Sequence, residues 1–209
     1  MDFITIRETV QAEIVEKKSK FIANLFPVES VEKAEELMKE TKKKYHDARH
    51  NCIAYRIVED NQIIEKSSDD GEPSRTAGAP MLNILQKNDL ANILVVVTRY
   101  FGGILLGTGG LVRAYSDSLL EAIEKSEKVQ KCQGIELLVM VEYSEFDHFK
   151  YYCKNNNIFI THVEYGETIA CKIELEDDKK EKLLIDFETK DTILKNIKEI
   201  TKKYITKSI

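Results

Sequence analysis

A buried strand followed by a glycine-rich turn constrains this fold more than any other segment. Residues 92–98 read Asn-Ile-Leu-Val-Val-Val-Thr, a run that is apolar on both faces and too β-branched and short for a helix. We therefore predict a central strand. Five glycines then occur within residues 102–110, and an amphipathic helix is expected over residues 110–128. The sequence thus predicts mixed α and β structure on either side of this turn.

Length and charge limit the classes of protein that are compatible with the chain. Its 209 residues are enough for two domains. No apolar run approaches the roughly 20 residues that span a bilayer, and the first residues lack the basic region and apolar core of a secretory signal. We therefore expect a cytoplasmic protein without a membrane partner. The net charge of −5 excludes a strongly basic nucleic-acid binder but is compatible with a local basic patch.

The first part of the chain is predicted to combine strands and helices. Runs of β-branched and aromatic residues indicate strands, and apolar residues at helical spacing indicate helices. We expect Ser30 to cap the first helix, and Ser74 or Thr76 to cap a short helix that carries Met81. The expected elements are strands at 12–17, 21–26, 51–58, 62–66 and 92–98, a turn at 18–20, and helices at 31–44 and 110–128.

A second series of predicted strands and helices begins after residues 129–133. Ser144 is a candidate cap for the first helix of this second part. We expect strands at 135–141, 158–165, 168–175 and 192–200, and helices at 144–155 and 177–188. This β-α-β-β-α-β order is the ferredoxin-like arrangement. We therefore predict an α+β protein of two domains, residues 1–131 and residues 132–209.

The glycine-rich turn is a candidate anion site. Glycine permits positive φ and close approach of the backbone, and the first N–H groups of the following helix lack intrahelical partners. Arg99 and Arg113 are expected to add charge-assisted contacts. Gly102, Gly107 and Thr108 have Walker A spacing without the lysine. The alternative is that the glycines only allow tight packing of helix on sheet, and both interpretations stand at this point.

A second polar segment lies at residues 69–80. Its Asp-Gly and Glu-Pro pairs are typical of a turn-rich loop. Asp69, Asp70 and Glu72 offer oxygen ligands that suit Mg²⁺. Because these carboxylates lack a defined spacing, an acidic surface loop is the favoured interpretation, and we assign no metal.

The cysteines predict no metal site or disulfide framework. They are scattered, without a Cys-x-x-Cys pair, so reduced and mostly buried thiols are expected. His50 and Cys52 lie two apart in a predicted strand and therefore face the same side. They are either half of a metal site, a base–nucleophile pair, or two strand residues with no chemistry between them, and we favour the last.

Four motifs in this order resemble the IMPACT/YigZ family. Residues 10–125 resemble the IMPACT N-terminal domain, and residues 135–205 resemble the YigZ-type C-terminal domain. Arg75 stands where the family usually has glycine. The motifs are AxHxCxAYR at 48–56, DDGEPS at 69–74, TAGAP at 76–80 and TRYFGG at 98–103, followed by the glycine segment to 116.

The resemblance implies a fold and a class of function. The first domain of the family shares the fold of a ribosomal small-subunit protein domain and of GHMP kinases, and the second resembles ferredoxin-like domains of elongation factor G. Eukaryotic IMPACT proteins regulate translation. We therefore expect a regulator that binds RNA, the ribosome or a translation factor, with no cofactor and no catalytic residue implied.

Two other functions stay open, and so does the question of whether the protein is an enzyme. One is an enzyme or sensor for a small phosphorylated metabolite, held by the glycine turn. In the other, both polar segments are internal packing and the ferredoxin-like domain is the interaction surface. The rarity of buried charges disfavours it. The candidate binding residues are His50, Asp69, Asp70, Gly71, Glu72, Pro73, Ser74, Thr76, Gly78, Arg99, Tyr100, Phe101, Gly102, Gly103, Gly107, Thr108, Gly109, Gly110 and Arg113.

Overall fold

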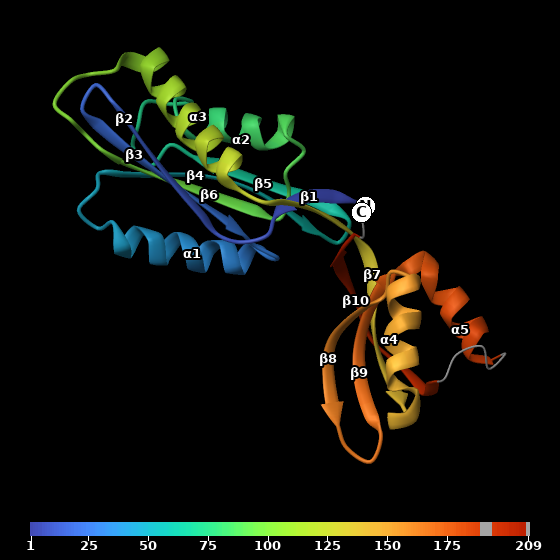
Figure 1. The fold of residues 1–209 in the computed structure, drawn as a ribbon. Coiled ribbons are helices and arrows are strands. Elements are labelled where there is room, and N and C mark those ends of the chain that lie inside the picture. The colour runs from blue at the N-terminus through green and yellow to red at the C-terminus, as the bar shows by residue number, and fades with distance from the viewer. Residues whose placement is uncertain (189–193, 208–209) are drawn as a thin grey trace. The chain divides into compact units, whose positions relative to one another are not determined.

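The structure, a computed structural model, describes residues 1–188 and 194–207. Contacts between Cα atoms divide it into one unit, Phe3–Val129, and a second unit that combines Met1–Asp2 with Gln130–Ile209. Each unit consists of a sheet with helices packed on it, so the protein is of the α+β class (Figure 1). In the described part of the chain, no helix is long and apolar enough to cross a membrane.

The N-terminal unit is built on an antiparallel five-stranded sheet in the order β2-β3-β6-β4-β5. The β-branched run predicted to be central forms β6, in the middle of this sheet, and its residues from Ile93 to Arg99 are all buried. Helix α1 lies on one face, and α2 and α3 lie on the other (Figure 1). The elements are β1 (Phe3–Ile6), β2 (Val10–Glu16), β3 (Ser19–Pro27), α1 (Val31–Lys44), β4 (His50–Glu59), β5 (Gln62–Ser68), α2 (Gly78–Lys87), β6 (Ile93–Tyr100) and α3 (Gly107–Lys125).

The two faces of strand β3 enter two different apolar clusters. Phe21 and Leu25 pack with residues of α2 and α3. Phe26 packs with the α1 side chains instead. Because side chains alternate along a strand, Asn24 points to the same face as Phe26. The sheet is therefore buried on both faces, and one polar residue of β3 faces the α1 side.

Several element boundaries differ from the sequence prediction, and two of them affect the glycine-rich turn and the neighbouring hairpin. Helix α3 begins at Gly107 rather than 110 and ends at Lys125, so Gly107, Gly109 and Gly110 form its first turn, whereas Gly102 and Gly103 precede it. The hairpin turn between β2 and β3 consists of Lys17 and Lys18, at φ 44° and 65°, rather than residues 18–20. Two central residues at positive φ match the right-handed twist of the flanking strands. Strand β1 was not predicted.

The C-terminal unit has four antiparallel strands in the order β10-β7-β9-β8. Ser144 lies in a short 3₁₀ turn before α4 rather than at its cap. Of the strand expected at 192–200, residues 192 and 193 lie outside the described residues, and the described strand continues to Thr206. The elements are β7 (Lys128–Val141), α4 (Phe146–Asn155), β8 (Phe159–Tyr165), β9 (Ile169–Glu176), α5 (Lys180–Glu188) and β10 (Leu194–Thr206).

Helix α1 supplies a direct test of the predicted cap. The Ser30 side-chain oxygen accepts a hydrogen bond from the Lys33 backbone N–H at 3.2 Å. Replacing Ser30→Ala leaves that N–H without its partner and should lower the free energy of unfolding by about 1 kcal/mol. Urea denaturation measures this, with the exposed Ser74→Ala as the control. An equal effect of both substitutions would contradict the capping role.

Candidate functional site

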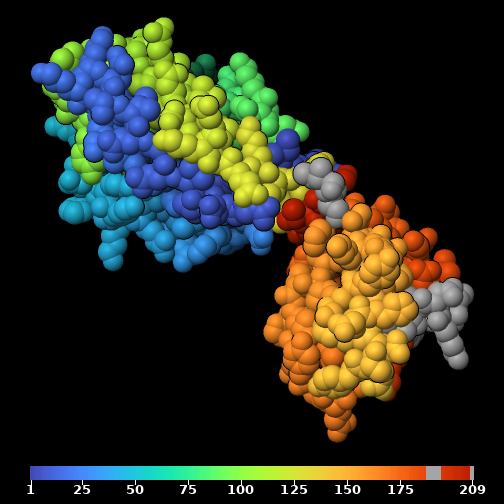
Figure 2. All heavy atoms as spheres, in the orientation of Figure 1, coloured from blue at the N-terminus to red at the C-terminus, as the bar shows by residue number. Residues whose placement is uncertain are grey.

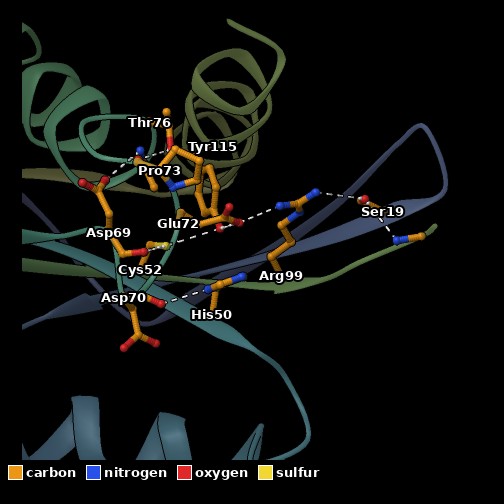
Figure 3. A network of polar contacts seen from close by, with 12 residues as sticks. Ser19, His50, Cys52, Asp69, Asp70, Glu72, Pro73, Thr76, Arg99 and Tyr115 are labelled. Atoms are coloured by element: carbon orange, nitrogen blue, oxygen red, sulfur yellow. Dashed lines mark hydrogen bonds and ion pairs between the residues drawn. The ribbon is translucent and has the colours of Figure 1, made fainter. Parts of the chain in front are cut away.

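A buried ion pair joins the two polar motifs. Arg99 Nη1 lies 2.7 Å from Glu72 Oε1, and only 7% and 3% of the two side chains are exposed. The same Glu72 oxygen accepts a hydrogen bond from the Tyr115 hydroxyl at 2.8 Å. Glu72 comes from the turn after β5, Arg99 from the end of β6 and Tyr115 from α3 (Figure 3). We had expected exposed loop motifs, whereas the charges at their centre are buried.

Aromatic rings enclose the Arg99 guanidinium. Its carbon lies 5.4 Å from the centre of the Phe21 ring and 5.6 Å from that of Phe101. Phe21 also contacts Tyr115 edge to face, with ring centres 5.1 Å apart. Such contacts stabilise a cation that has lost its water. Arg99 is therefore committed to the protein interior and is not available to neutralise a ligand, as we had expected it to be.

The tip of the β2–β3 hairpin is pressed against the glycine turn. Ser19 Oγ accepts a hydrogen bond from the Gly102 N–H at 3.1 Å, and it lies 3.5 Å from Arg99 Nη2. A Cβ atom on Gly102 would lie 2.0 Å from the Lys18 carbonyl carbon. Only glycine fits such an approach. The all-atom view shows the hairpin and α3 in contact (Figure 2).

Asp69 caps helix α2 although it lies nine residues before the first residue of that helix. One of its carboxylate oxygens accepts hydrogen bonds from the N–H groups of Ala77 and Gly78, at 2.9 and 2.8 Å. We expected Ser74 or Thr76 in this role, and that was wrong. Thr76 Oγ1 donates instead to the Pro73 carbonyl, and Ser74 is exposed. A negative charge at the start of a helix is stabilised by the helix dipole.

The turn that carries Asp69 uses unusual backbone conformations. Asp70, Gly71 and Arg75 have φ of 39°, 87° and 62°. The second Asp69 oxygen accepts a hydrogen bond from the Arg75 N–H at 2.7 Å. Glycine adopts positive φ with less strain than other residues. Glycine at position 75 would therefore adopt this φ with less strain than Arg75 does.

His50 and Cys52 bind this turn rather than each other. His50 Nδ1 lies 2.9 Å from the Asp70 carbonyl oxygen, and Cys52 Sγ donates to the Asp69 carbonyl at 3.0 Å. They face the same side of the strand, as predicted. Burial raises the pKa of the Cys52 thiol to about 12, and burial likewise raises the pKa of Tyr115. Neither group is activated as a nucleophile.

The three acidic side chains of the turn serve separate purposes. Asp69 caps α2, Glu72 pairs with Arg99, and Asp70 accepts a hydrogen bond from the Asn51 N–H at 2.8 Å and lies near Lys42. Within residues 1–188 and 194–207, no three His, Cys, Asp or Glu side chains are placed to hold a metal together. Each carboxylate of the turn therefore contacts protein groups in the folded chain.

The remaining candidate residues are divided between buried and exposed positions. Tyr100 points away from the network and donates to Asp47 at 2.7 Å, a bond that raises the pKa of Tyr100 to about 12. Gly78 is buried against the Ser68 backbone. Thr108 and Arg113 are exposed on α3, and no ion pair joins Arg113 to a described residue. Thr108 and Arg113 are therefore accessible from solvent, whereas Gly78 is not.

Different physical constraints act at the glycine positions of the turn. Gly103 and Gly107 adopt φ of 85° and 75°, and Gly102 makes the close approach described above. A Cβ on Gly110 would lie 3.0 Å from Leu106 Cβ. Gly109 has an ordinary φ, and a Cβ there would meet nothing within 4 Å. Tight packing therefore explains Gly102 but not Gly109.

Apolar side chains project into solvent beside these glycines. Phe101 and Leu105 are 50% and 82% exposed, and Ile104 is exposed as well. Lys17 and Lys18 are exposed at the adjacent hairpin tip, and Arg113 follows Gly109 by one helical turn. We call this set the loop surface. It consists of Lys17, Lys18, Phe101, Ile104, Leu105 and Arg113.

Sequence reasoning missed several residues that form the support of this surface. Ser19 had been assigned to a turn, and Phe21 and Tyr115 lie in the strand expected at 21–26 and the helix expected at 110–128, without a role in a site. Lys17 and Lys18 had no assigned role. Period-two burial could have placed Ser19 and Phe21 on one face of β3. Nothing in the sequence pairs the Tyr115 hydroxyl with Glu72, 43 residues away.

Comparison with known proteins covers both units. Residues 17–123 match the model of the Impact N-terminal domain. Residues 139–186 match a domain of unknown function, DUF1949. The IMPACT family member YvyE of Bacillus subtilis is 36% identical over 175 residues, which are 84% of this chain and 80% of YvyE. The chain belongs to the IMPACT family.

Other IMPACT family members share the same segments. YigZ of Escherichia coli is 41% identical over 139 residues, 66% of this chain and 67% of YigZ. Rat Protein IMPACT is 39% identical over 100 residues, which are 46% of this chain but only 31% of the rat protein. A crystal structure of a hypothetical protein superposes with a TM-score of 0.64 at 29% identity, covering 96% of this chain and 98% of that one. The match to the Impact N-terminal domain, residues 17–123, covers the buried network and the loop surface.

Removing one charge of the buried pair should destabilise the protein strongly. Arg99→Met leaves Glu72 buried without its cation and should cost roughly 3–5 kcal/mol in urea unfolding. Adding Glu72→Met should recover part of this loss. Arg7 pairs with Glu127 on the surface, where 58% and 62% of the side chains are exposed, so Arg7→Met should cost less than about 1 kcal/mol. If the losses of unfolding free energy from Arg99→Met and Glu72→Met simply add in the double variant, the two residues are not coupled.

The Cys52 thiol should be unreactive in the folded protein. With a pKa of about 12, roughly one thiol in 10,000 is ionised at pH 8, and the thiolate is the nucleophile. Iodoacetamide labelling read by peptide mass spectrometry should modify Cys52 slowly in buffer and quickly in denaturing urea. Rapid labelling of the native protein, at the rate of a free cysteine peptide, would show an activated thiol and revive the enzyme interpretation.

Proposed function

We propose that this IMPACT family protein is a non-enzymatic regulator of translation that binds ribosomal RNA through the loop surface. RNA, the ribosome and a translation factor are the partner classes implied by the family resemblance. Among them, the combination of exposed cations, an aromatic ring and open helix N–H groups favours RNA. Phosphates bind to lysine, arginine and helix N-termini, and unpaired bases stack on aromatic rings.

Gly109 is the observation that carries this proposal. It lies in the first turn of α3, where alanine would be more favourable for the helix. Its φ is ordinary and its surroundings are empty, so the fold itself gives no reason for glycine. A partner that approaches the backbone closely gives one. Leu106 also leaves the start of the helix without a side-chain cap, so its N–H groups are open to an acceptor.

The hairpin tip supports the same conclusion. Lys17 and Lys18 both have positive φ, a conformation in which asparagine and glycine are preferred. Backbone strain of this kind costs energy and tends to occur at functional sites. Two lysines at strained positions, next to the glycine turn, place positive charge where a polyanion would meet it. Their side chains are exposed.

The alternative of an enzyme has less support from the chemistry of the site. Most polar groups under the loop surface bind one another, although Arg99 Nε has no hydrogen-bond partner among the described residues. The pKa values of Cys52 and Tyr115 are raised rather than lowered. A sensor for a small phosphorylated metabolite would use the same helix N-terminus. It would not need the exposed apolar side chains of Phe101 and Leu105.

We extend the proposal to fold type and location. The strand order β10-β7-β9-β8 and the element order of the C-terminal unit favour a ferredoxin-like domain. For the N-terminal unit, the family resemblance favours the ribosomal-protein and GHMP-kinase type. The boundary proposed from sequence, after residue 131, falls close to the division at residue 129. The cytoplasm is the compartment in which such a protein would meet ribosomes.

Ribosome co-sedimentation at increasing salt tests the proposed function. Wild-type protein should pellet with ribosomes at low salt and be released as salt rises. Lys17→Glu with Lys18→Glu should weaken binding and reduce the slope of log K against log salt by about 1 for each phosphate that a lysine no longer neutralises. Gly109→Ala should weaken binding while raising the free energy of unfolding by up to about 1 kcal/mol.

The matched control reverses two charges on the opposite face of the sheet. Lys39 and Lys43 of α1 are exposed, so Lys39→Glu with Lys43→Glu changes the net charge equally and should leave binding unchanged. Equal loss in both double variants would indicate a nonspecific charge effect. Binding of a phosphorylated metabolite, with no ribosome binding, would favour the sensor instead.

A further inference from the structure

A groove lies between the end of α1 and the β2–β3 side of the sheet. Its volume is about 260 Å³, below the roughly 300–1,000 Å³ typical of sites for drug-sized ligands. Figure 1 places α1 on the face opposite α2 and α3, so this groove is separate from the loop surface. The ligand it admits must be small.

Two rows of side chains line the groove. The sheet contributes Gln11 and Asn24, which are paired across β2 and β3, and the ring of Phe26 two residues further along β3. Residues three and four apart lie on one side of a helix, and α1 presents one such row. That row consists of Leu37, Glu40, Thr41 and Lys44.

Asn24 is the feature that the fold does not explain. It is 5% exposed, and its side-chain nitrogen Nδ2 has no hydrogen-bond partner among the described residues. A buried amide without a partner destabilises a protein. Valine or leucine would be favoured on this face of β3 if packing alone mattered, because Phe26 and Leu37 already pack there. Asn24 lines the groove, and its buried amide N–H groups lack an acceptor oxygen.

The charges of the groove are also unpaired. Glu40 and Lys44 are exposed and form no ion pair with residues that the structure describes, and the Lys44 ammonium lies 4.9 Å from the centre of the Tyr45 ring. They lie one helical turn apart on the groove wall, so one anionic and one cationic group border the same small space. Phe26 and Leu37 give that space an apolar surface. A ligand that matches these groups needs an acceptor oxygen, one negative and one positive charge, and an apolar side chain. An apolar α-amino acid has all four.

We propose that this groove binds a free apolar α-amino acid. Its carboxylate accepts a hydrogen bond from the Asn24 amide and faces Lys44. Its ammonium group faces Glu40, and its side chain rests on Phe26 and Leu37. This site is independent of RNA binding by the loop surface, because none of its lining residues belongs to that surface.

Isothermal titration with L-leucine and two truncated analogues tests the site. 4-Methylpentanoate lacks the amine and 3-methylbutylamine lacks the carboxylate, so each should bind at least about tenfold more weakly than leucine. Leucine should also shift the backbone amide NMR signals of Gln11, Asn24 and Lys44. Failure of leucine to bind at millimolar concentration, or equal binding of 4-methylpentanoate, would overturn the proposal.

Asn24→Leu separates a binding role from a structural one. It removes the unpartnered amide, so the variant without ligand should melt at a higher temperature than wild type, and it should lose leucine binding. A structural role predicts the reverse, a lower melting temperature with leucine affinity retained. Lys44→Ala should weaken leucine binding about tenfold, whereas Lys43→Ala, at the neighbouring position, should not. If Asn24→Leu fails to fold, the comparison of these two lysine variants tests the site. Equal affinities for leucine in all these variants would refute the site.

Discussion

The pairing of Glu72 with Arg99 inside the N-terminal unit is the interaction on which the candidate surface depends. A buried charge is tolerated only when a partner of opposite charge and further hydrogen bonds surround it. Here the partner is 27 residues away, and Tyr115 supplies the second bond. The β3 start, the turn after β5, the β6 end and α3 must therefore all be in place together. Residues 101–106 begin directly beyond this network, so their position is set by it.

The sequence was sufficient for the elements and for the family, because both depend on local patterns. β-Branched residues placed β6 at the centre of its sheet, and Ser30 began α1 as its hydrogen-bonding chemistry predicts. It was not sufficient for the polar network. The general rule that charged side chains are exposed made internal packing of the two motifs our least favoured interpretation. That rule fails for Arg99 and Glu72, because a pair of opposite charges can be buried although either one alone cannot.

The same limit applies to the cap of α2. Ser74 and Thr76 lie immediately before the helix and have suitable side chains, yet Asp69 provides the acceptor. The turn brings it back through residues at positive φ, including Arg75. A single sequence shows neither that path nor the approach of Ser19 to Gly102. Both are consequences of how separate segments pack. Packing of this kind decides which polar groups have hydrogen-bond partners and which, such as the Asn24 amide, do not.

The contrast between the buried network and residues 101–106 has an evolutionary consequence. Each member of the network holds groups from other segments, so a substitution there demands compensating changes elsewhere and the network is expected to drift slowly. Ile104 and Leu105 are exposed to solvent, and their side chains have no polar group that could join the network. Such positions can change one at a time without unfolding the unit. Descendants of one ancestor can thus acquire different partners by exchanging a few loop side chains on an unchanged support.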